Sequence, residues 1–293
     1  MMGFKRVAVV GAATAVVSCM GVPGVVSAAP APGGRSVVPV VGPGSEVGVV
    51  QEWGVGGRVR VKSCTVGVVA ERPDGRRVAV TAGHCGEPGQ QVGARAAGVD
   101  GFVRVGAVAK SVAPRSRVDP KTGESYVVDA LAADWAVVDL SPRVSTRVAR
   151  GPVRQTVVGV ARVGDRVCQQ GITSGWRCGS VLAVKGALFA TDIKSRPGDS
   201  GGPVMRLADG AALGIASRGT GDDVSAGEQV TIYTGLQDVL ARGGGLRLAT
   251  GDRAGVSAGR MVSVDEEAVV LPEAMSAPAL LRAASVEAAA IVG

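Results

Sequence analysis

Two short strings decide the fold of this chain: Thr81-Ala82-Gly83-His84-Cys85 and Gly198-Asp199-Ser200-Gly201-Gly202-Pro203. Each places one reactive side chain among small residues. A serine hydroxyl becomes a nucleophile when a base takes its proton, and an imidazole suits this task because it titrates near neutral pH. Glycines around a serine let the backbone approach a substrate carbonyl and point N–H groups at a developing negative charge. His84 and Ser200 are therefore the candidate base and nucleophile.

A third string, Asp134-Trp135-Ala136-Val137-Val138, offers a carboxylate to this pair. A carboxylate bonded to the second ring nitrogen fixes the tautomer of the imidazole and stabilises its charged form. Asp129 and Asp139 are the competing acids, and Asp139 comes at the end of the expected strand. The motif Gly-x-Ser-x-Gly also occurs in α/β-hydrolases, but that fold needs a His after the Ser, and His84 is the only His of this chain.

The composition around these strings favours an all-β fold. Hydrophobic residues make up 46% of the 293 residues, which is enough for a packed core, and 45 residues are Gly. Short Val-rich runs alternate with turn signals, and two pairs of runs have hairpin patterns: Val66–Ala70 with Arg77–Thr81, and Val204–Leu207 with Leu213–Ser217. Further strands are expected at Phe102–Val108, Tyr126–Ala130, Trp135–Leu140, Thr156–Val163 and Val181–Val184, and one helix at Thr234–Arg242. This spacing of short strands predicts a sandwich or a barrel.

The charge pattern argues against a nucleic-acid partner. The net charge is +7, but the basic residues are spread thinly among acids, and only 3% of the residues are aromatic. Nucleic-acid binding requires a basic patch, and single strands also require aromatic surfaces for stacking. We therefore expect no nucleic-acid partner.

Residues 1–28 have the pattern of an export signal: two basic residues, an apolar stretch, and small residues at Val26-Ser27-Ala28 for cleavage. An alternative is a lipoprotein that is acylated on Cys19. An uncleaved anchor is disfavoured because the stretch is short and Pro23 interrupts it. No later segment has about 18 consecutive apolar residues, so we expect no membrane span in the mature protein.

Removal of the leader leaves four cysteines, Cys64, Cys85, Cys168 and Cys178. In an exported protein these are expected to pair, and their grouping favours Cys64–Cys85 and Cys168–Cys178 over the other two connectivities. A single His and the absence of a Cys-x-x-Cys motif exclude a zinc site. No metal and no cofactor is expected.

Two segments flank the β-rich part of the chain. Residues 29–54 begin with a Pro- and Gly-rich stretch and are interpreted as a lead-in or a short pro-segment. Residues 243–293 form a C-terminal extension rich in Ala, Val and Glu. Ser263 and Glu266 have the spacing of a capping box, and Ala279–Val292 could form a helix, but a loosely packed or disordered tail is an equal alternative.

The three strings resemble those of the chymotrypsin-like (trypsin-fold) serine peptidases, and in particular the small secreted bacterial branch of the streptogrisins and α-lytic protease. The resemblance covers about residues 55–242. Val55-Gly56-Gly57 resembles the start of the mature domain, residues 168–178 the disulfide hairpin, and residues 196–203 the active-site loop. The resemblance implies two six-stranded antiparallel β-barrels, at about residues 58–145 and 155–242, with a catalytic cleft between them.

The same resemblance assigns the roles in the site. Ser200 would attack a peptide carbonyl, His84 would act as general base and then as general acid, and Asp134 would orient His84. The backbone N–H groups of Gly198 and Ser200 would form the oxyanion hole. Two features of the relatives are missing: a large pro-region, and a third disulfide, because Lys194 stands at one cysteine position and no Cys follows Gly219.

The resemblance places the walls of the specificity pocket at Ser217-Arg218-Gly219 and at Thr231. An alignment without a gap puts Lys194 at the base of the pocket, whereas an alignment through an insertion at Arg196-Pro197 puts Asp192 there and is preferred. A buried charge without a counter-ion is costly, so Lys194 would select an acidic and Asp192 a basic substrate side chain. The alternative is that both side chains point to solvent, and that the pocket, lined in part by Ile193, takes a small or apolar residue.

These observations predict a secreted serine endopeptidase that hydrolyses protein or peptide substrates as a monomer. The alternative from another class is a catalytically inactive, trypsin-like binding module of the cell envelope. Reaction of Ser200 with a fluorophosphonate discriminates between the two, because only an activated serine is labelled.

Overall fold

The computed structural model describes residues 38–53, 59–118, 120–121, 125–129, 131–219, 229–256 and 268–270. The predicted export signal with Cys19, the capping box at Ser263 and the helix at Ala279–Val292 lie outside the described residues. In the described part, strands dominate, and the one α-helix has seven residues. The prediction of an all-β fold with a short C-terminal helix is confirmed.

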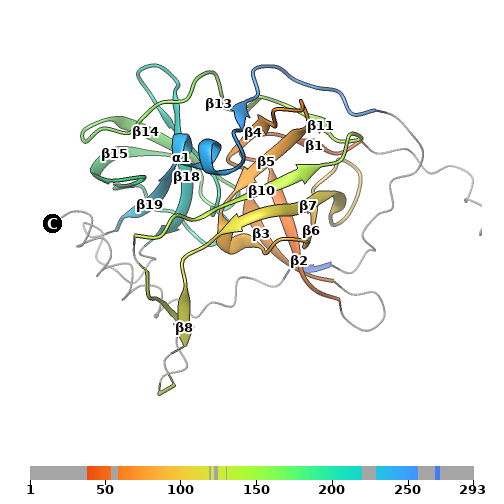
Figure 1. Cartoon of the computed structure of the whole chain (residues 1–293), viewed down its shortest axis with the longest axis horizontal. Coiled ribbons are helices and arrows are strands. Elements are labelled where there is room, and N and C mark those ends of the chain that lie inside the picture. Colours follow the sequence, from red (N-terminus) through yellow and green to blue (C-terminus); the bar gives the residue numbers. More distant parts are fainter. Residues whose placement is uncertain are drawn as a thin grey trace, which may run out of the picture. The chain divides into compact units, whose positions relative to one another are not determined.

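The first group of strands forms one mainly antiparallel sheet (Figure 1), and the turn that carries His84 belongs to this part of the chain. Its members are β2 (Glu46–Trp53), β3 (Val59–Thr65), β4 (Val68–Glu71), β5 (Arg77–Thr81), β6 (Gln91–Ala94), β7 (Val103–Val112), β10 (Trp135–Leu140), β20 (Arg247–Leu248) and β21 (Ala268–Val270). Their order is β20-β4-β5-β10-β7-β6-β2-β3-β21. Only Val66 and Gly67 separate β3 from β4, so one bent strand pairs with β2 through its first half and with β5 through its second half. The sheet therefore closes on itself through the covalent continuity of this strand.

The folded unit includes residues that the sequence interpretation left to the lead-in. β1 (Val40–Val41) pairs with β11 (Ser145–Thr146), and β2 lies between β3 and β6. Val41 of β1 and Val47 and Val49 of β2 are buried in the core beside the first sheet, and the two residues of β2 share a face because side chains alternate along a strand. Val55-Gly56-Gly57 falls in the undescribed stretch after β2, so the first barrel already has a strand before the residues that resemble its start.

The second group of strands forms a closed barrel in the order β14-β15-β16-β19-β18-β17. These strands are β14 (Arg166–Gly171), β15 (Gly175–Lys185), β16 (Leu188–Thr191), β17 (Pro203–Arg206), β18 (Ala212–Gly219) and β19 (Thr231–Gly235). Ser200 lies in the turn before β17, and Thr231 begins β19. Smaller elements are β8 (Ser116–Val118), β9 (Ser125–Val127), β12 (Ala149–Arg150), β13 (Val153–Arg154), the 3₁₀ turn η2 (Gly83–Cys85) and the helix α1 (Leu236–Arg242).

Most of the expected strands are present, but the prediction of one strand is wrong. Both predicted hairpins form, as β4–β5 and β17–β18, and the helix begins two residues later than expected. Residues 156–163 were expected to form a strand, but they have only an isolated bridge between Val158 and Ala212. Val157, Val160 and Val163 are 52%, 52% and 67% exposed, so the apolar side chains that suggested a strand lie at the surface.

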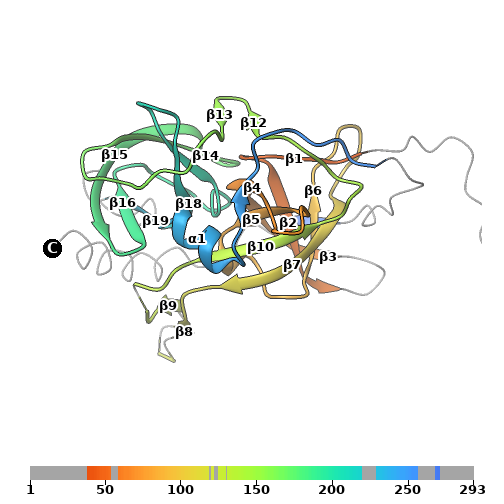
Figure 2. The same ribbon diagram turned by 45° about the horizontal axis from the view of Figure 1, so that its top comes forward.

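An apolar cluster that includes residues of α1 joins the two strand groups, and α1 lies between β18 and β10 in Figure 2. Leu236 and Val239 of the helix are fully buried, and they share this cluster with Val137 of β10 and Ile215 of β18. Truncating one such buried Leu to Ala costs about 2–5 kcal/mol of folding free energy. The cluster thereby fixes β10, which follows Asp134, against β18, which carries Ser217.

Both predicted disulfides are present. Cys64 of β3 is bonded to Cys85 at the end of η2, and Cys168 of β14 is bonded to Cys178, which lies opposite it on β15. The first bridge holds the turn that carries His84 against the first sheet. Among the helices of the described part, none is both long and apolar enough to cross a membrane.

Candidate active site

His84 and Ser200 come from different strand groups and meet at a hydrogen bond. The distance between His84 Nε2 and Ser200 Oγ is 2.9 Å. η2 presents His84, and three contacts fix this turn: the Cys64–Cys85 disulfide, a bond from Lys62 Nζ to the His84 carbonyl at 2.9 Å, and a bond from Ser111 Oγ to the Gly83 carbonyl at 2.9 Å. The imidazole side chain is 27% exposed, so it can be reached from solvent.

Asp134 lies on the other side of the imidazole. Its Oδ2 accepts the Nδ1–H of His84 at 2.7 Å, and its Oδ1 accepts the backbone N–H of His84 at 2.9 Å. Thr234 of β19 holds the backbone of Asp134, because its Oγ1 accepts the Asp134 N–H at 3.0 Å. The carboxylate therefore fixes both the ring and the backbone of His84, and it selects the tautomer in which Nε2 can accept the proton of Ser200.

Ser217 is a further partner of the carboxylate. Its Oγ donates to Asp134 Oδ2 at 2.6 Å, and both side chains are buried. The sequence interpretation placed Ser217 on the wall of the specificity pocket, and no pattern in the sequence signalled this contact. It depends on the packing of β18 against the segment before β10.

The electrostatics keep Asp134 ionised despite its burial. Burial on its own raises the pKa of this carboxyl, because a charge is poorly solvated inside the protein. The charge and the hydrogen bond of His84, the hydroxyl of Ser217 and the His84 N–H act in the opposite direction, and they bring the pKa below its usual value. At neutral pH the site therefore holds a carboxylate next to an imidazole.

The competing acids lie elsewhere. Asp139 pairs with Arg72, whose Nη2 is 2.6 Å from Asp139 Oδ1, at the far end of β10. Asp129 is half-buried in the segment before Asp134, where its carbonyl accepts the N–H of Ala132. Of the three acids weighed from the sequence, the structure brings only Asp134 to His84.

Two threonine hydroxyls hold carbonyl groups of the loop before Ser200. The carbonyl of Pro197 accepts the hydroxyl of Thr173 at 2.6 Å, and the carbonyl of Gly198 accepts the hydroxyl of Thr65 at 2.7 Å. In a trans peptide the C=O and N–H groups point in opposite directions, so the bond from Thr173 turns the N–H of Gly198 away from the protein body. Gly198 has φ of 95°, a conformation that favours glycine. Thr173 and Thr65 were not predicted, because they reach this loop only through tertiary contacts.

Asp199 anchors the same loop from inside. It is fully buried, its Oδ1 accepts the N–H groups of Thr173 and Ser174 at 3.0 Å each, and its Oδ2 accepts the N–H of Arg196 at 2.8 Å. These bonds tie the β14–β15 turn to the segment before the serine. The backbone around Ser200 is thereby held in one shape before any ligand binds.

The two charged candidates for the pocket base are both exposed. Asp192 accepts the N–H of Ser180 through Oδ1 at 2.6 Å, and Lys194 lies two residues further along the same segment. Between them, Ile193 is 2% exposed and packs into the core of the second barrel. The buried charge on which the predicted acidic or basic selectivity depended is therefore absent at these two positions.

Thr231 and Gly219 do lie beside the active-site loop. The Oγ1 of Thr231 donates to the Ile193 carbonyl at 2.6 Å and lies 2.9 Å from Ser195 Oγ. A Cβ on Gly219 would come within 2.6 Å of that Ser195 hydroxyl. Hydroxyl contacts thus hold residues 193–195 against the start of β19, with Ser195 close to Gly219.

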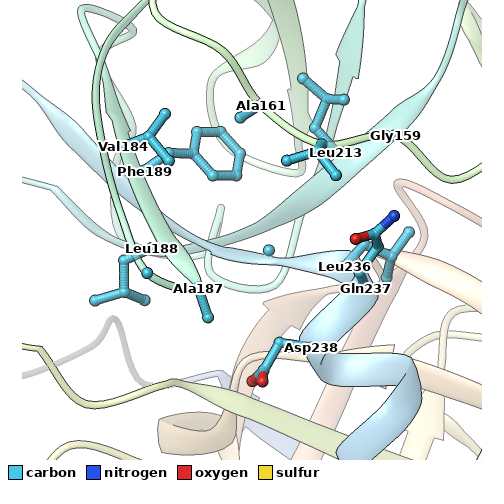
Figure 3. Close-up of a pocket in the computed structure, with 13 residues that line it drawn as sticks. Gly159, Ala161, Val184, Ala187, Leu188, Phe189, Leu213, Leu236, Gln237 and Asp238 are labelled. Atoms are coloured by element: carbon cyan, nitrogen blue, oxygen red, sulfur yellow. The ribbon is translucent and has the colours of Figure 1, made fainter.

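The described residues offer little for a metal. Cys64, His84 and Cys85 have ligand-type atoms close together, but the two cysteines form a disulfide and cannot supply thiolates. A cavity of about 370 Å³ opens beside α1 (Figure 3). Leu188, Phe189, Leu213 and Leu236 give it an apolar lining, with Asp238 at one side, and it is not the place where His84 meets Ser200.

Comparison with known proteins identifies the family. The family model named Trypsin matches residues 62–241, which is more than half of the chain and includes His84, Asp134 and Ser200. The chain belongs to the trypsin family. The predicted resemblance to chymotrypsin-like serine peptidases is thereby confirmed.

Individual proteins are similar to this chain over part of its length. Rv1815, an uncharacterized protein of Mycobacterium tuberculosis, is 31% identical over 157 residues, which are 52% of this chain and 65% of that protein. Streptogrisin-C of Streptomyces griseus is 29% identical over 198 residues, which are 64% of this chain and 38% of that protein. The crystal structure of a Nocardiopsis protease, NAPase, superposes with a TM-score of 0.50 at 25% identity, covering 72% of this chain and 100% of that one.

Proposed function

We propose that this member of the trypsin family is a serine endopeptidase in which Ser200, His84 and Asp134 form the catalytic triad. The observation that carries the proposal is the hydrogen-bonded series from Ser200 Oγ to His84 Nε2 at 2.9 Å, and from His84 Nδ1 to Asp134 Oδ2 at 2.7 Å. In the first half of the reaction, Ser200 Oγ forms a bond to the substrate carbonyl carbon while His84 Nε2 takes the hydroxyl proton. His84 then gives this proton to the departing amine as the peptide C–N bond breaks, which leaves an acyl ester on Ser200.

The second half reverses these roles. A water molecule attacks the ester carbon, His84 takes a proton from the water, and the same proton returns to Ser200 Oγ when the acid product leaves. In both halves the carbonyl oxygen becomes negative, and the N–H groups of Gly198 and Ser200 would donate to it. The anchoring of the Pro197 carbonyl by Thr173 supports this assignment, because it turns the Gly198 N–H outward.

The chain is organised for export under this proposal. Two disulfides are typical of proteins that mature in an oxidising compartment, and they support an extracellular location. Residues 1–28 would be the signal that is removed, with acylation of Cys19 as the alternative, and the peptidase domain would be followed by the C-terminal extension. Because β2 is a barrel strand, we place the start of that domain near residue 40 rather than residue 55.

We further infer that the substrate side chain before the cleaved bond is small and uncharged. The exposure of Asp192 and Lys194 supports this, since a charge that points to water exerts little selection. The hydroxyls of Ser195 and Thr231 and the backbone of Gly219 carry no charge, and the charged Arg218 beside Gly219 directs its Nη1 to Ser217 Oγ.

Labelling with a fluorophosphonate tests the proposed function on the purified full-length protein with its disulfides intact. We expect a single adduct on the peptide that contains Ser200, at a rate that rises with pH as His84 loses its proton. Ser200→Ala should abolish the adduct, and Ser195→Ala, which removes a neighbouring hydroxyl outside the triad, should retain it. Absence of any adduct in correctly oxidised protein would favour the inactive binding module instead.

A further inference from the structure

A β-bulge in β18 places two consecutive side chains on the same side of the strand. Along the β18–β19 pair, Ala216 faces Tyr233 and Arg218 faces Ile232, so Ser217 is an extra residue without a partner. In a regular strand, consecutive side chains point to opposite faces, and a bulge changes this alternation. The bulge explains how the side chains of Ser217 and Arg218 can contact each other although they are neighbours in sequence.

The contact between Arg218 and Ser217 adds a cation, the Arg218 guanidinium, to the series of hydrogen bonds that joins Ser200, His84, Asp134 and Ser217. Arg218 Nη1 donates to Ser217 Oγ at 2.9 Å, and the Ser217 hydroxyl donates its own proton to Asp134 Oδ2 at 2.6 Å. A hydroxyl that accepts from a cation becomes a stronger donor, because the bonds polarise one another. We propose that Arg218 is a positioning residue of the active site: its guanidinium orients the Ser217 hydroxyl toward Asp134 and adds a permanent positive charge beside the triad.

This charge acts on the protonation of His84. Among the described residues, Asp134 bonds the His84 ring, Lys62 of β3 donates to the His84 carbonyl, and Arg218 of β18 is linked to Asp134 through the Ser217 hydroxyl. A carboxylate favours the protonated imidazole, whereas a nearby cation disfavours it. Removal of the Arg218 charge is therefore expected to favour the protonated form of His84. The consequence for the reaction rate rests on the proposed function, whereas the effect of the Arg218 charge on the protonation of His84 does not.

The single His of the chain makes this effect directly measurable. In the full-length protein labelled with ¹³C-histidine, the Cε1–H signal of His84 reports its protonation without interference from another imidazole. We would titrate the wild type, Arg218→Met and Arg218→Lys. With the charge removed in Arg218→Met, the midpoint should move to higher pH by about half a unit, and with the charge kept in Arg218→Lys it should move by less than about 0.2 units. Arg218→Gln, which keeps donors but not the charge, should behave like Arg218→Met and replaces it if that variant does not fold.

The pH dependence of the fluorophosphonate reaction links the titration to catalysis. The acidic limb of the rate profile should shift by the same amount as the titration in each variant. Identical midpoints in the wild type and both uncharged variants would overturn the inference, and so would equal shifts in Arg218→Lys and Arg218→Met, which would indicate a packing effect. If the variants show the expected titration shifts but the wild type never reacts with the fluorophosphonate, the proposed function is refuted and the positioning role of Arg218 stands.

Discussion

Ser217→Ala removes one of the hydrogen bonds that the buried carboxylate of Asp134 accepts. The Ser217 hydroxyl lies 2.6 Å from Asp134 Oδ2, and both residues are no more than 2% exposed, so water cannot readily replace the lost donor. A hydrogen bond to a charged group contributes about 1.5–3 kcal/mol to folding. We therefore expect the variant to lose about 2 kcal/mol of unfolding free energy at pH 7.

The pH dependence of this loss follows from the pKa of Asp134. The folded-state pKa of this carboxyl lies below its usual value, and the Ser217 hydroxyl is one of the causes that lower it. A carboxyl with a lowered pKa contributes stability above its unfolded pKa, and this contribution is lost as the pH falls through the folded value. As the pH falls through the lowered folded-state pKa, the carboxyl takes up its proton, and the hydroxyl then bonds a neutral group, which is worth about 1 kcal/mol. The difference in unfolding free energy between Ser217→Ala and the protein that keeps Ser217 should therefore become smaller at acidic pH.

The measurement requires a catalytically inactive parent protein, because an active peptidase would cleave unfolded copies of itself. Urea unfolding of Ser200→Ala and of Ser200→Ala with Ser217→Ala, between pH 7 and pH 3, can be followed by tryptophan fluorescence, since Trp135 next to Asp134 is fully buried. Ser111→Ala is the matched control, because its hydroxyl donates to the neutral Gly83 carbonyl at 2.9 Å. We expect the control to lose about 1 kcal/mol at every pH. If the two serine variants lose the same free energy over the whole range, the Ser217 hydroxyl does not support an ionised Asp134, and the electrostatic reasoning fails.

Three further predictions concern the triad, a disulfide and the pocket. His84→Ala should lower the rate of peptide hydrolysis by about four orders of magnitude and leave the circular dichroism spectrum unchanged, because no other imidazole can replace it; retention of a hundredth of the rate would contradict the mechanism. Replacing Cys64 and Cys85 by Ala should cost about 3 kcal/mol of unfolding free energy, since the bridge closes a loop with a sequence separation of 21 residues, and a denaturant titration of the variant measures this. Asp192→Asn and Lys194→Met should change the peptide-library cleavage profile less than about twofold, because exposed charges are screened by water and salt; loss of cleavage after Arg in the first variant would reinstate Asp192 as the pocket base.

Local signals carried much of the information about the fold and the candidate site. The strings around His84, Asp134 and Ser200 combine a reactive side chain with its immediate neighbours, and such patterns can be recognised without knowledge of the rest of the chain. The hairpins β4–β5 and β17–β18 have their turn residues between their strands, and both disulfides join cysteines that are near in sequence. In each case the partners are brought together by a short connection, so the sequence alone was sufficient.

Contacts between distant segments required the tertiary structure. The assignment of β2 to the first barrel depends on its pairing with β6, and the exposure of Val160 is decided by tertiary packing, neither of which the local pattern of Val residues reveals. The contact of Ser217 with Asp134 spans 83 residues and depends on a bulge in β18. The sequence thus determined which residues could react, whereas packing decided which hydrogen bonds and charges surround them, because burial and strand register arise only when both strand groups are assembled.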